Sequence, residues 1–271
     1  MIIRQPIVAG HFYPGTAEKL NTLIQTWGTE PEPILEPALG VITPHGAYDQ
    51  CGPVIFETFK RVSPVNTFVL LGPNHNDREK QAVVFKRGIW VTPFGEVCID
   101  NHFTQLLSTE MPSLKEDIYA HDKEHCLEVQ LPIMQYLIKT PFKIVPILLP
   151  AEFYNDLALE LSSAITRTIQ GLSQSTAIIA TTDMSRDLSP EMAKRKDQML
   201  INALLHMEIE QILSNIKRYG IRYCGLTSLL TLLYVTRDLG ATGGELIDYI
   251  CCGENEDDFA RVNGYAGILV K

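Results

Sequence analysis

The chain has 271 residues, of which 45% are hydrophobic and 20% charged, a composition typical of soluble globular proteins and unlike that of disordered chains. Its net charge of −9 and its lack of a Lys/Arg-rich run argue against nucleic-acid binding, which needs clustered cations. No apolar run reaches the roughly 18–20 residues of a membrane span. The six cysteines form no CxxC pair and follow no secretory leader. We therefore expect a cytoplasmic protein with neither nucleic acid nor membrane as a partner.

Short apolar, β-branched segments alternate with longer amphipathic ones along the chain. We predict strands at 39–43, 66–71, 81–85, 142–149, 176–181 and 265–270. After a short amino-terminal helix and an exposed connection at 29–37, we predict helices at 52–62 (Pro53 in the first turn), 153–170, from Ser189-Pro190-Glu191 onward, 207–219 and 225–239. This alternation predicts an α/β fold with a central, mostly parallel or mixed sheet covered by helices on both faces. Without a linker or repeat, we expect residues 1–271 to form a single domain.

Three predicted strands lead directly into polar loops. The strand at 39–43 precedes His45, the strand at 66–71 precedes His75, and the strand at 176–181 precedes Asp183. Ligands of such sheets gather at the carboxyl ends of strands, so we expect these side chains to share one edge. Two imidazoles there are suitable ligands for a divalent metal, although each histidine on its own also fits an ordinary loop residue.

Two further segments carry reactive side chains. His121 and His125 are one helical turn apart, and Glu128 is three residues after His125, so these residues share a helix face if the segment is helical. A solvated helix start explains the same pattern, and Pro132 means that a helix either begins near Leu131 or kinks there. Cys224 precedes a very apolar helix, where the helix dipole favours a metal-binding thiolate; a buried, inert thiol is the alternative.

Five segments, in order, resemble the Memo family, also called protein B of the AmmeMemoRadiSam system. They are Arg4-Gln5-Pro6-Ile7-Val8-Ala9-Gly10-His11-Phe12-Tyr13-Pro14, Pro44-His45-Gly46-Ala47-Tyr48, Leu71-Gly72-Pro73-Asn74-His75, Glu124-His125-Cys126-Leu127-Glu128-Val129-Gln130-Leu131-Pro132 and Asn263-Gly264-Tyr265-Ala266-Gly267. The resemblance implies a fold like that of the class III extradiol ring-cleaving dioxygenases. It also implies a site that binds iron or copper; a donor set of sulfur and two nitrogens also suits zinc.

Carried over residue by residue, the resemblance implies that His45, His75 and Cys224 are the metal ligands. It places His125 and Glu128 in the same pocket, where they and Asp183 orient the ligands or the substrate. It also implies a radical-SAM enzyme and an AMMECR-domain protein as functional partners.

The sequence departs from the family pattern at three places, and these departures leave two functional hypotheses open. His45 is followed by Gly-Ala in inverted order, and Asn76 stands where some members carry a second histidine. Arg186 replaces the histidine that serves dioxygenase relatives as acid/base; a guanidinium cannot exchange a proton but can clamp an anion. Two hypotheses follow: a metal-dependent oxidoreductase acting on a small or anionic substrate, or a non-catalytic module that binds a peptide or small ligand.

Overall fold

The computed structural model describes residues 2–28, 37–76, 80–219, 223–252 and 261–271. The eleven strands among these residues form one mixed sheet, in the order β1-β5-β6-β8-β3-β9-β2-β11-β10. Off this path, β4 pairs with β8, and β7 pairs with β4. The strands are β1 (Ile3–Arg4), β2 (Gly40–Thr43), β3 (Thr67–Asn74), β4 (Val83–Val84), β5 (Ile89–Thr92), β6 (Gly95–Ile99), β7 (Lys115–Glu116), β8 (Lys143–Pro150), β9 (Thr176–Thr181), β10 (Gly244–Cys252) and β11 (Asn263–Val270). The central pairs β8-β3, β3-β9 and β9-β2 are all parallel.

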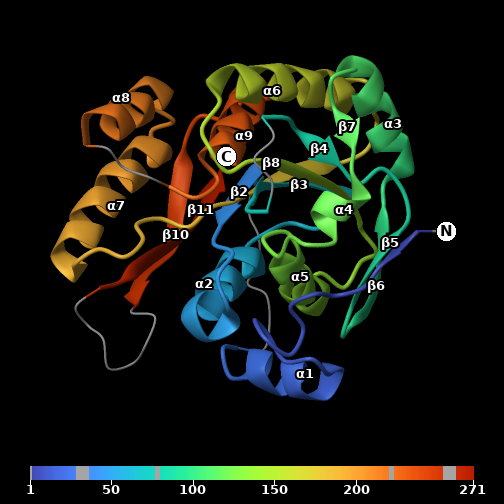
Figure 1. Cartoon of the computed structure of the whole chain (residues 1–271), viewed down its shortest axis with the longest axis horizontal. Coiled ribbons are helices and arrows are strands. Elements are labelled where there is room, and N and C mark those ends of the chain that lie inside the picture. Colours follow the sequence, from blue (N-terminus) through green and yellow to red (C-terminus); the bar gives the residue numbers. More distant parts are fainter. Residues whose placement is uncertain (1, 29–36, 77–79, 220–222, 253–260) are drawn as a thin grey trace.

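Helices cover both faces of this sheet, as Figure 1 shows. They are α1 (Ala17–Gln25), α2 (Tyr48–Lys60), α3 (Asn101–Glu110), α4 (Ile118–His121), α5 (Leu131–Leu137), α6 (Asn155–Gln170), α7 (Pro190–Leu205), α8 (Ile209–Tyr219) and α9 (Leu226–Asp238), with a 3₁₀ turn at Glu128–Gln130. One core packs under α3, α6, α7, α8 and α9, and a second core packs under α1, α2 and α5. The predicted α/β fold with two covered faces is confirmed.

Alternation along the central strands explains why they are apolar throughout. In β3, Val69 and Leu71 enter one core while Phe68 and Leu70 enter the other. All eight residues of this strand are buried. A parallel strand covered on both faces needs such a continuous apolar run, and each buried aliphatic side chain contributes about 1.5–3 kcal/mol.

Several boundaries differ from the sequence prediction. Helix α2 begins at Tyr48 rather than at residue 52, so Pro53 lies inside the helix and removes one helical hydrogen bond. The predicted strand at 81–85 is reduced to β4. The sequence prediction missed β5, β6, β10 and α3, while the connection at 29–37 lies almost wholly outside the described residues. Of the two alternatives at Pro132, a helix start is confirmed, because α5 begins at Leu131.

Glycine is required where two segments meet near the carboxyl ends of the central strands. Gly225 precedes α9 with φ of +88°, and a Cβ there would lie 2.5 Å from the carbonyl oxygen of Thr181. A Cβ on Gly72 in β3 would lie 2.5 Å from Sγ of Cys126. These two glycines let the segments that carry Cys224 and Cys126 pack directly against the sheet. Among the described helices, none combines the length and apolarity needed to cross a bilayer.

His121 is completely buried in the second core, against the rings of Phe85 and Trp90. Its Nδ1 lies 2.6 Å from the carbonyl oxygen of Asp117. Burial, aided by the positive charge of Arg4, lowers the pKa of His121 from 6.5 to about 4. His121 and His125 therefore do not share a functional face, contrary to the expectation from their spacing.

Acid should destabilise the fold through His121. The pKa of His121 is lower in the folded than in the unfolded chain, so the unfolded chain binds more protons between pH 6.5 and 4. The free energy of unfolding therefore decreases as the pH is lowered through that window. We expect this residue to cost roughly 2.5 kcal/mol of unfolding free energy by pH 4.5. Urea unfolding of wild type and His121→Gln at pH 7.0, 5.5 and 4.5 measures it. Equal pH slopes for the two proteins would contradict the assignment.

Candidate metal centre

Three parallel strands position the polar loops at one edge of the sheet. His75 follows β3 immediately, while His45 and Asp183 come two residues after the ends of β2 and β9. Because β3, β9 and β2 are neighbours in the sheet, the three loops lie side by side. The expectation that these residues share one sheet edge is confirmed.

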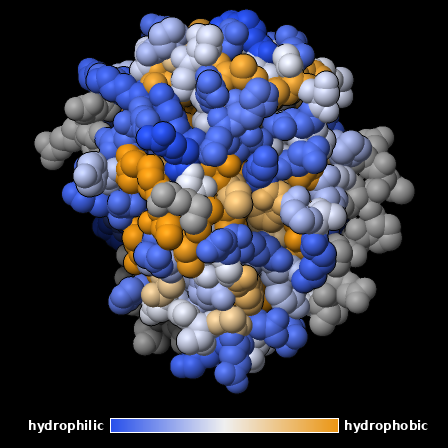
Figure 2. Space-filling model, turned by 90° about the vertical axis from the view of Figure 1, so that its right-hand side faces the viewer, coloured by the Kyte–Doolittle hydropathy of each residue, from blue (hydrophilic) through white to orange (hydrophobic). Residues whose placement is uncertain are grey.

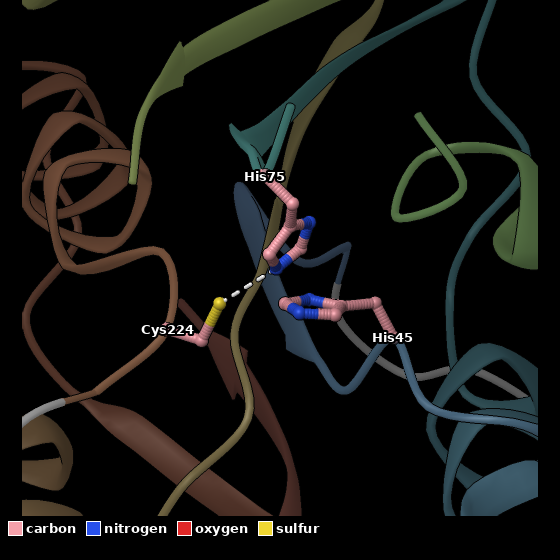
Figure 3. A group of neighbouring side chains, drawn as sticks. All are labelled: His45, His75 and Cys224. Carbon is pink, nitrogen blue, oxygen red and sulfur yellow. Dashed lines mark hydrogen bonds between the residues drawn. The ribbon is translucent and has the colours of Figure 1, made fainter. Parts of the chain in front are cut away.

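Cys224 reaches the same place from the segment before α9. It forms an antiparallel bridge with Asp183, and the hydroxyl of Thr182 donates a hydrogen bond to its carbonyl oxygen. Figure 3 shows His45, His75 and Cys224 pointing toward one another from three separate segments. Nε2 of His75 lies 2.9 Å from Sγ of Cys224. One ligand atom from each residue lies within 4.8 Å of the others, an arrangement able to hold a metal ion.

The chemistry of the three donors fits a metal ion. The buried Nδ1 of His45 has no hydrogen-bond partner among the described residues, although buried polar atoms nearly always have one. Two imidazole nitrogens and a sulfur suit iron, copper or zinc and fit magnesium or calcium poorly. Three ligands also leave room for a further ligand, as catalytic metal sites do. The three residues thus fit a transition metal.

Glu124 orients His75, a role that the sequence analysis missed. Its Oε1 accepts a hydrogen bond from Nδ1 of His75 at 2.9 Å, and its Oε2 accepts one from the backbone N–H of His75 at 2.7 Å. A carboxylate on Nδ1 fixes the tautomer that leaves the Nε2 lone pair for a metal. Glu124 stands in the segment that resembles the Memo family, but the His-to-His spacing gave no reason to single it out.

His125 lies beside His75 and Glu124, but these three residues do not point their ligand atoms at one metal position. His75, Glu124 and His125 also lie close enough together to hold a metal. However, the rings of His75 and His125 are nearly parallel, at 18° and 5.0 Å, and Nδ1 of His125 already lies 3.1 Å from Oε1 of Glu124. Imidazole lone pairs lie in the ring plane, so stacked rings do not aim them at one point. Glu124 therefore acts as a shared hydrogen-bond acceptor for both rings.

Asp183 supports both His45 and Cys224. Its Oδ1 accepts a hydrogen bond from the backbone N–H of His45 at 3.0 Å, and its Oδ2 lies 3.6 Å from Nε2 of the same residue. Its backbone pairs with Cys224.

A cavity of about 810 Å³ opens above the three candidate ligands. His125, Asp183 and Arg186 line it, together with the aromatic rings of Phe12 and Tyr265. Its size is that of a small-molecule pocket. The structure thus brings six of the seven predicted site residues to one cavity.

Glu128 is the exception, and the expectation that it lines the pocket is corrected. Its carboxylate is 1% exposed, forms an ion pair with Arg4 at 2.7 Å and accepts hydrogen bonds from the hydroxyl of Tyr13 and the backbone of Ile7 and Val8. Glu128 is therefore absent from the lining of the cavity that His125 faces. It fastens the amino-terminal segment, and removing one partner of such a buried pair costs about 3–5 kcal/mol.

In the metal-free protein, the imidazoles of His45 and His75 lower the pKa of the Cys224 thiol, and Cys224 in turn contributes to raising theirs. Burial raises the pKa of Cys224, but hydrogen bonds and charges from His45 and His75 outweigh it and lower the pKa to about 7. Burial lowers the pKa of His75, but Cys224 and Glu124 raise it to about 10. Burial likewise opposes protonation of His45, yet Asp183 and Cys224 raise its pKa. Hydrogen bonds from His125 and His75 overcome burial and keep the pKa of Glu124 well below its ordinary value.

The fold and these donors define an α/β protein with a His₂Cys candidate metal site beneath a small-molecule cavity. Residues 4–269 match the family model described as Memo-like protein. The chain is 34% identical to a MEMO1 family protein of Methanococcus maripaludis strain C5, 32% to one of Methanopyrus kandleri and 33% to one of Aquifex aeolicus. In each comparison the match covers 99% of both chains. The chain therefore belongs to the Memo family.

The low pKa of Cys224 should be visible in its reactivity. In metal-stripped protein, we expect alkylation of Cys224 by iodoacetamide to reach half its maximal rate near pH 7, because only the thiolate reacts. Replacing His75 with alanine should lower the rate at pH 7 at least about tenfold, since thiolate stabilisation is lost while burial remains. Mass spectrometry of the Cys224 peptide follows both rates. A midpoint near pH 9 in both proteins would contradict the arrangement.

Proposed function

We propose that this Memo-family protein is a metal-dependent oxidoreductase, dioxygenase-like in its chemistry, that acts on a small anionic substrate. The observation that carries the proposal is the convergence of His45, His75 and Cys224 below the 810 Å³ cavity. Iron or copper is the metal that the donor set favours, with zinc as the alternative. When bound there, a redox metal would supply activation of dioxygen.

The chain's own residues would divide the remaining tasks. Glu124 holds His75 with Nε2 directed at the metal position, and Asp183 holds His45 and Cys224. Arg186 lines the cavity in place of the family's acid/base histidine and offers a fork of donors for an anionic group. His125 is left to hold or move a proton at Nε2, because its Nδ1 faces Glu124 while its ring lines the cavity.

A second candidate function is binding without turnover, and the arginine at position 186 favours it. A site that lacks its usual acid/base histidine loses a contribution of about 10²–10⁴-fold in rate. The two functions differ in their need for metal. A binding module keeps its ligand after chelation, whereas the proposed enzyme consumes oxygen only with metal bound.

Metal binding should depend on the three convergent residues. We expect protein purified without nickel chromatography to hold about one equivalent of iron or copper, and His45→Ala, His75→Ala and Cys224→Ser each to hold less than about one tenth. Glu124→Gln should weaken the affinity about 10–100-fold, because the carboxylate that orients His75 is neutralised. Plasma mass spectrometry and competition with a chromophoric chelator give these values.

His206→Ala serves as the matched control for metal binding. His206 is at the end of α7, and the hydrogen bond of its ring within the described part of the chain is to the carbonyl oxygen of Asn202. Its removal should leave the metal content unchanged, and circular dichroism should show that every variant is folded. Metal content equal to wild type in folded His45→Ala and His75→Ala would overturn the proposal.

Anion binding in the same cavity should depend on Arg186. Benzoate is a suitable probe, because the cavity combines this arginine with the rings of Phe12, Tyr223 and Tyr265. We expect Arg186→Gln to weaken benzoate binding about tenfold, since a charged hydrogen-bond pair contributes about 1.5–3 kcal/mol. Arg195→Gln, on the exposed side of α7, is the charge-matched control and should change binding less than about twofold. Calorimetric titrations that give equal affinities for all three proteins would exclude this role.

A further inference from the structure

A second cavity, of about 770 Å³, lies on the side of the molecule that carries β1, β5 and β6 (Figure 1). We call it the hairpin cavity, after the β5–β6 hairpin. It shares no lining residue with the metal centre. Figure 2 faces this side, where hydrophobic residues form a broken band across the middle with hydrophilic residues above and below. Neither the metal-ligand group nor the proposed reaction makes use of this cavity.

The lining of the hairpin cavity is positively charged although the protein as a whole is acidic. Arg87, His102 and Lys143 line it, and no carboxylate belongs to its described lining. The chain carries 32 acidic residues against 23 Lys and Arg, so a cavity of this size with only basic groups departs from the average surface. An adjoining cavity of about 500 Å³ shares Arg87 and adds Lys86, with Glu116 as its one acidic residue among those described.

The backbone holds these basic residues at fixed places. Lys143 is the first residue of β8 and is paired in register with Cys98 of β6. Arg87 precedes Gly88, whose φ is +124° and whose position leaves no room for a Cβ, which would lie 2.3 Å from the carbonyl oxygen of Ile2. The carbonyl oxygen of Gly88 in turn accepts a hydrogen bond from the backbone N–H of Ile99. The turn that presents Arg87 is therefore determined by close packing against the amino-terminal segment.

The nearest buried acid does not neutralise this cluster by direct pairing. Asp100 is 1% exposed, and its oxygens accept hydrogen bonds from Thr67, Gln174 and the backbone N–H of Phe103. Among the described residues it forms no close ion pair with Lys143. Burial raises the pKa of Asp100, but hydrogen bonds, with that from Thr67 the largest, outweigh burial and lower the pKa, and the charge of Lys143 adds to this effect. The basic groups consequently face the cavity above a floor that includes the buried side chains of Ile89 and Ile99.

We propose that the hairpin cavity binds a small molecule through its phosphate groups. Arg87 provides a planar fork that suits a phosphate, and Lys143 provides a compact positive charge for a second negative group. His102 adds a ring N–H donor. The volume exceeds that of pyrophosphate and is within the range of pockets that hold nucleotide-sized molecules. This site is independent of the proposed function of the metal centre.

Cys98 supplies a local readout, because its exposed thiol lines the hairpin cavity, whereas Cys224 lines the metal-site cavity. Iodoacetamide is uncharged and reports access to each thiol. With inorganic pyrophosphate at ten times its Kd and 0.15 M salt, we expect alkylation of Cys98 to slow roughly tenfold, since about nine-tenths of the sites are then filled. Alkylation of Cys224 should not change. Peptide mass spectrometry of the full-length protein measures both cysteines in one sample.

Substitutions test whether Arg87 and Lys143 bind the anion specifically, rather than through the non-specific attraction of any surface charge. Arg87→Gln and Lys143→Gln should each weaken pyrophosphate binding about tenfold, measured by calorimetry and by Cys98 protection. Lys217→Gln, which removes one exposed charge from α8, should change it less than about twofold. Three outcomes would overturn the proposal. They are protection of Cys224 alone, equal weakening of binding by Lys217→Gln, and no protection of Cys98 at 10 mM pyrophosphate, a concentration of about 10⁴ times a micromolar Kd.

Discussion

Parallel pairing of β2, β9 and β3 is the constraint on which the candidate metal centre depends. These strands run side by side in the sheet, so the loops that follow them leave at the same edge. His45, Asp183 and His75 are separated by 30 to 138 residues in sequence, yet the register of three strands brings them together. Of the three candidate ligands, Cys224 is the one that does not follow a strand of this group. The backbone bridge between Asp183 and Cys224 attaches it to the same edge of the sheet.

The site depends on buried carboxylates as much as on its candidate ligands. Glu124 and Glu128 are each 1% exposed, and a charge so deeply buried is tolerated only where hydrogen bonds or ion pairs compensate its lost hydration. Glu124 obtains that compensation from His75, His125 and the adjacent backbone, and Glu128 obtains it from Arg4 and the amino-terminal segment. Each carboxylate thereby forces a particular arrangement on the groups around it. Glu124 determines the orientation of a candidate ligand, whereas Glu128 determines only the path of the chain.

The sequence predicted the central strands and the convergence of the histidine loops, because apolar runs and strand-end polar residues are local patterns. The sequence prediction was wrong where the alternation of apolar and polar residues is interrupted or where a role depends on distant residues. The strand β10 was missed because a register shift between Leu246 and Asp248 breaks its alternation of apolar and polar residues. The role of Glu124 was missed for another reason: its importance arises from two histidines that only the fold brings beside it. Regular spacing likewise grouped His121 with His125, although the chain turns between them and buries only His121 in the core.

Arg186 lines the metal-site cavity from the loop that follows β9. The loop that carries it is held by its neighbours: the backbone N–H and hydroxyl of Ser185 both donate to the buried Asp197, and Met184 bonds to the backbone of Gly264. A Cβ on Gly264 would collide with Asp197, so this support leaves no space for a larger residue. The loop is thus fixed independently of what side chain stands at position 186. Under the proposed function, the arginine at this position would recognise an anion where a histidine would transfer a proton, while His45, His75 and Cys224 would still hold the metal. Metal binding and turnover would then be separable properties of this site.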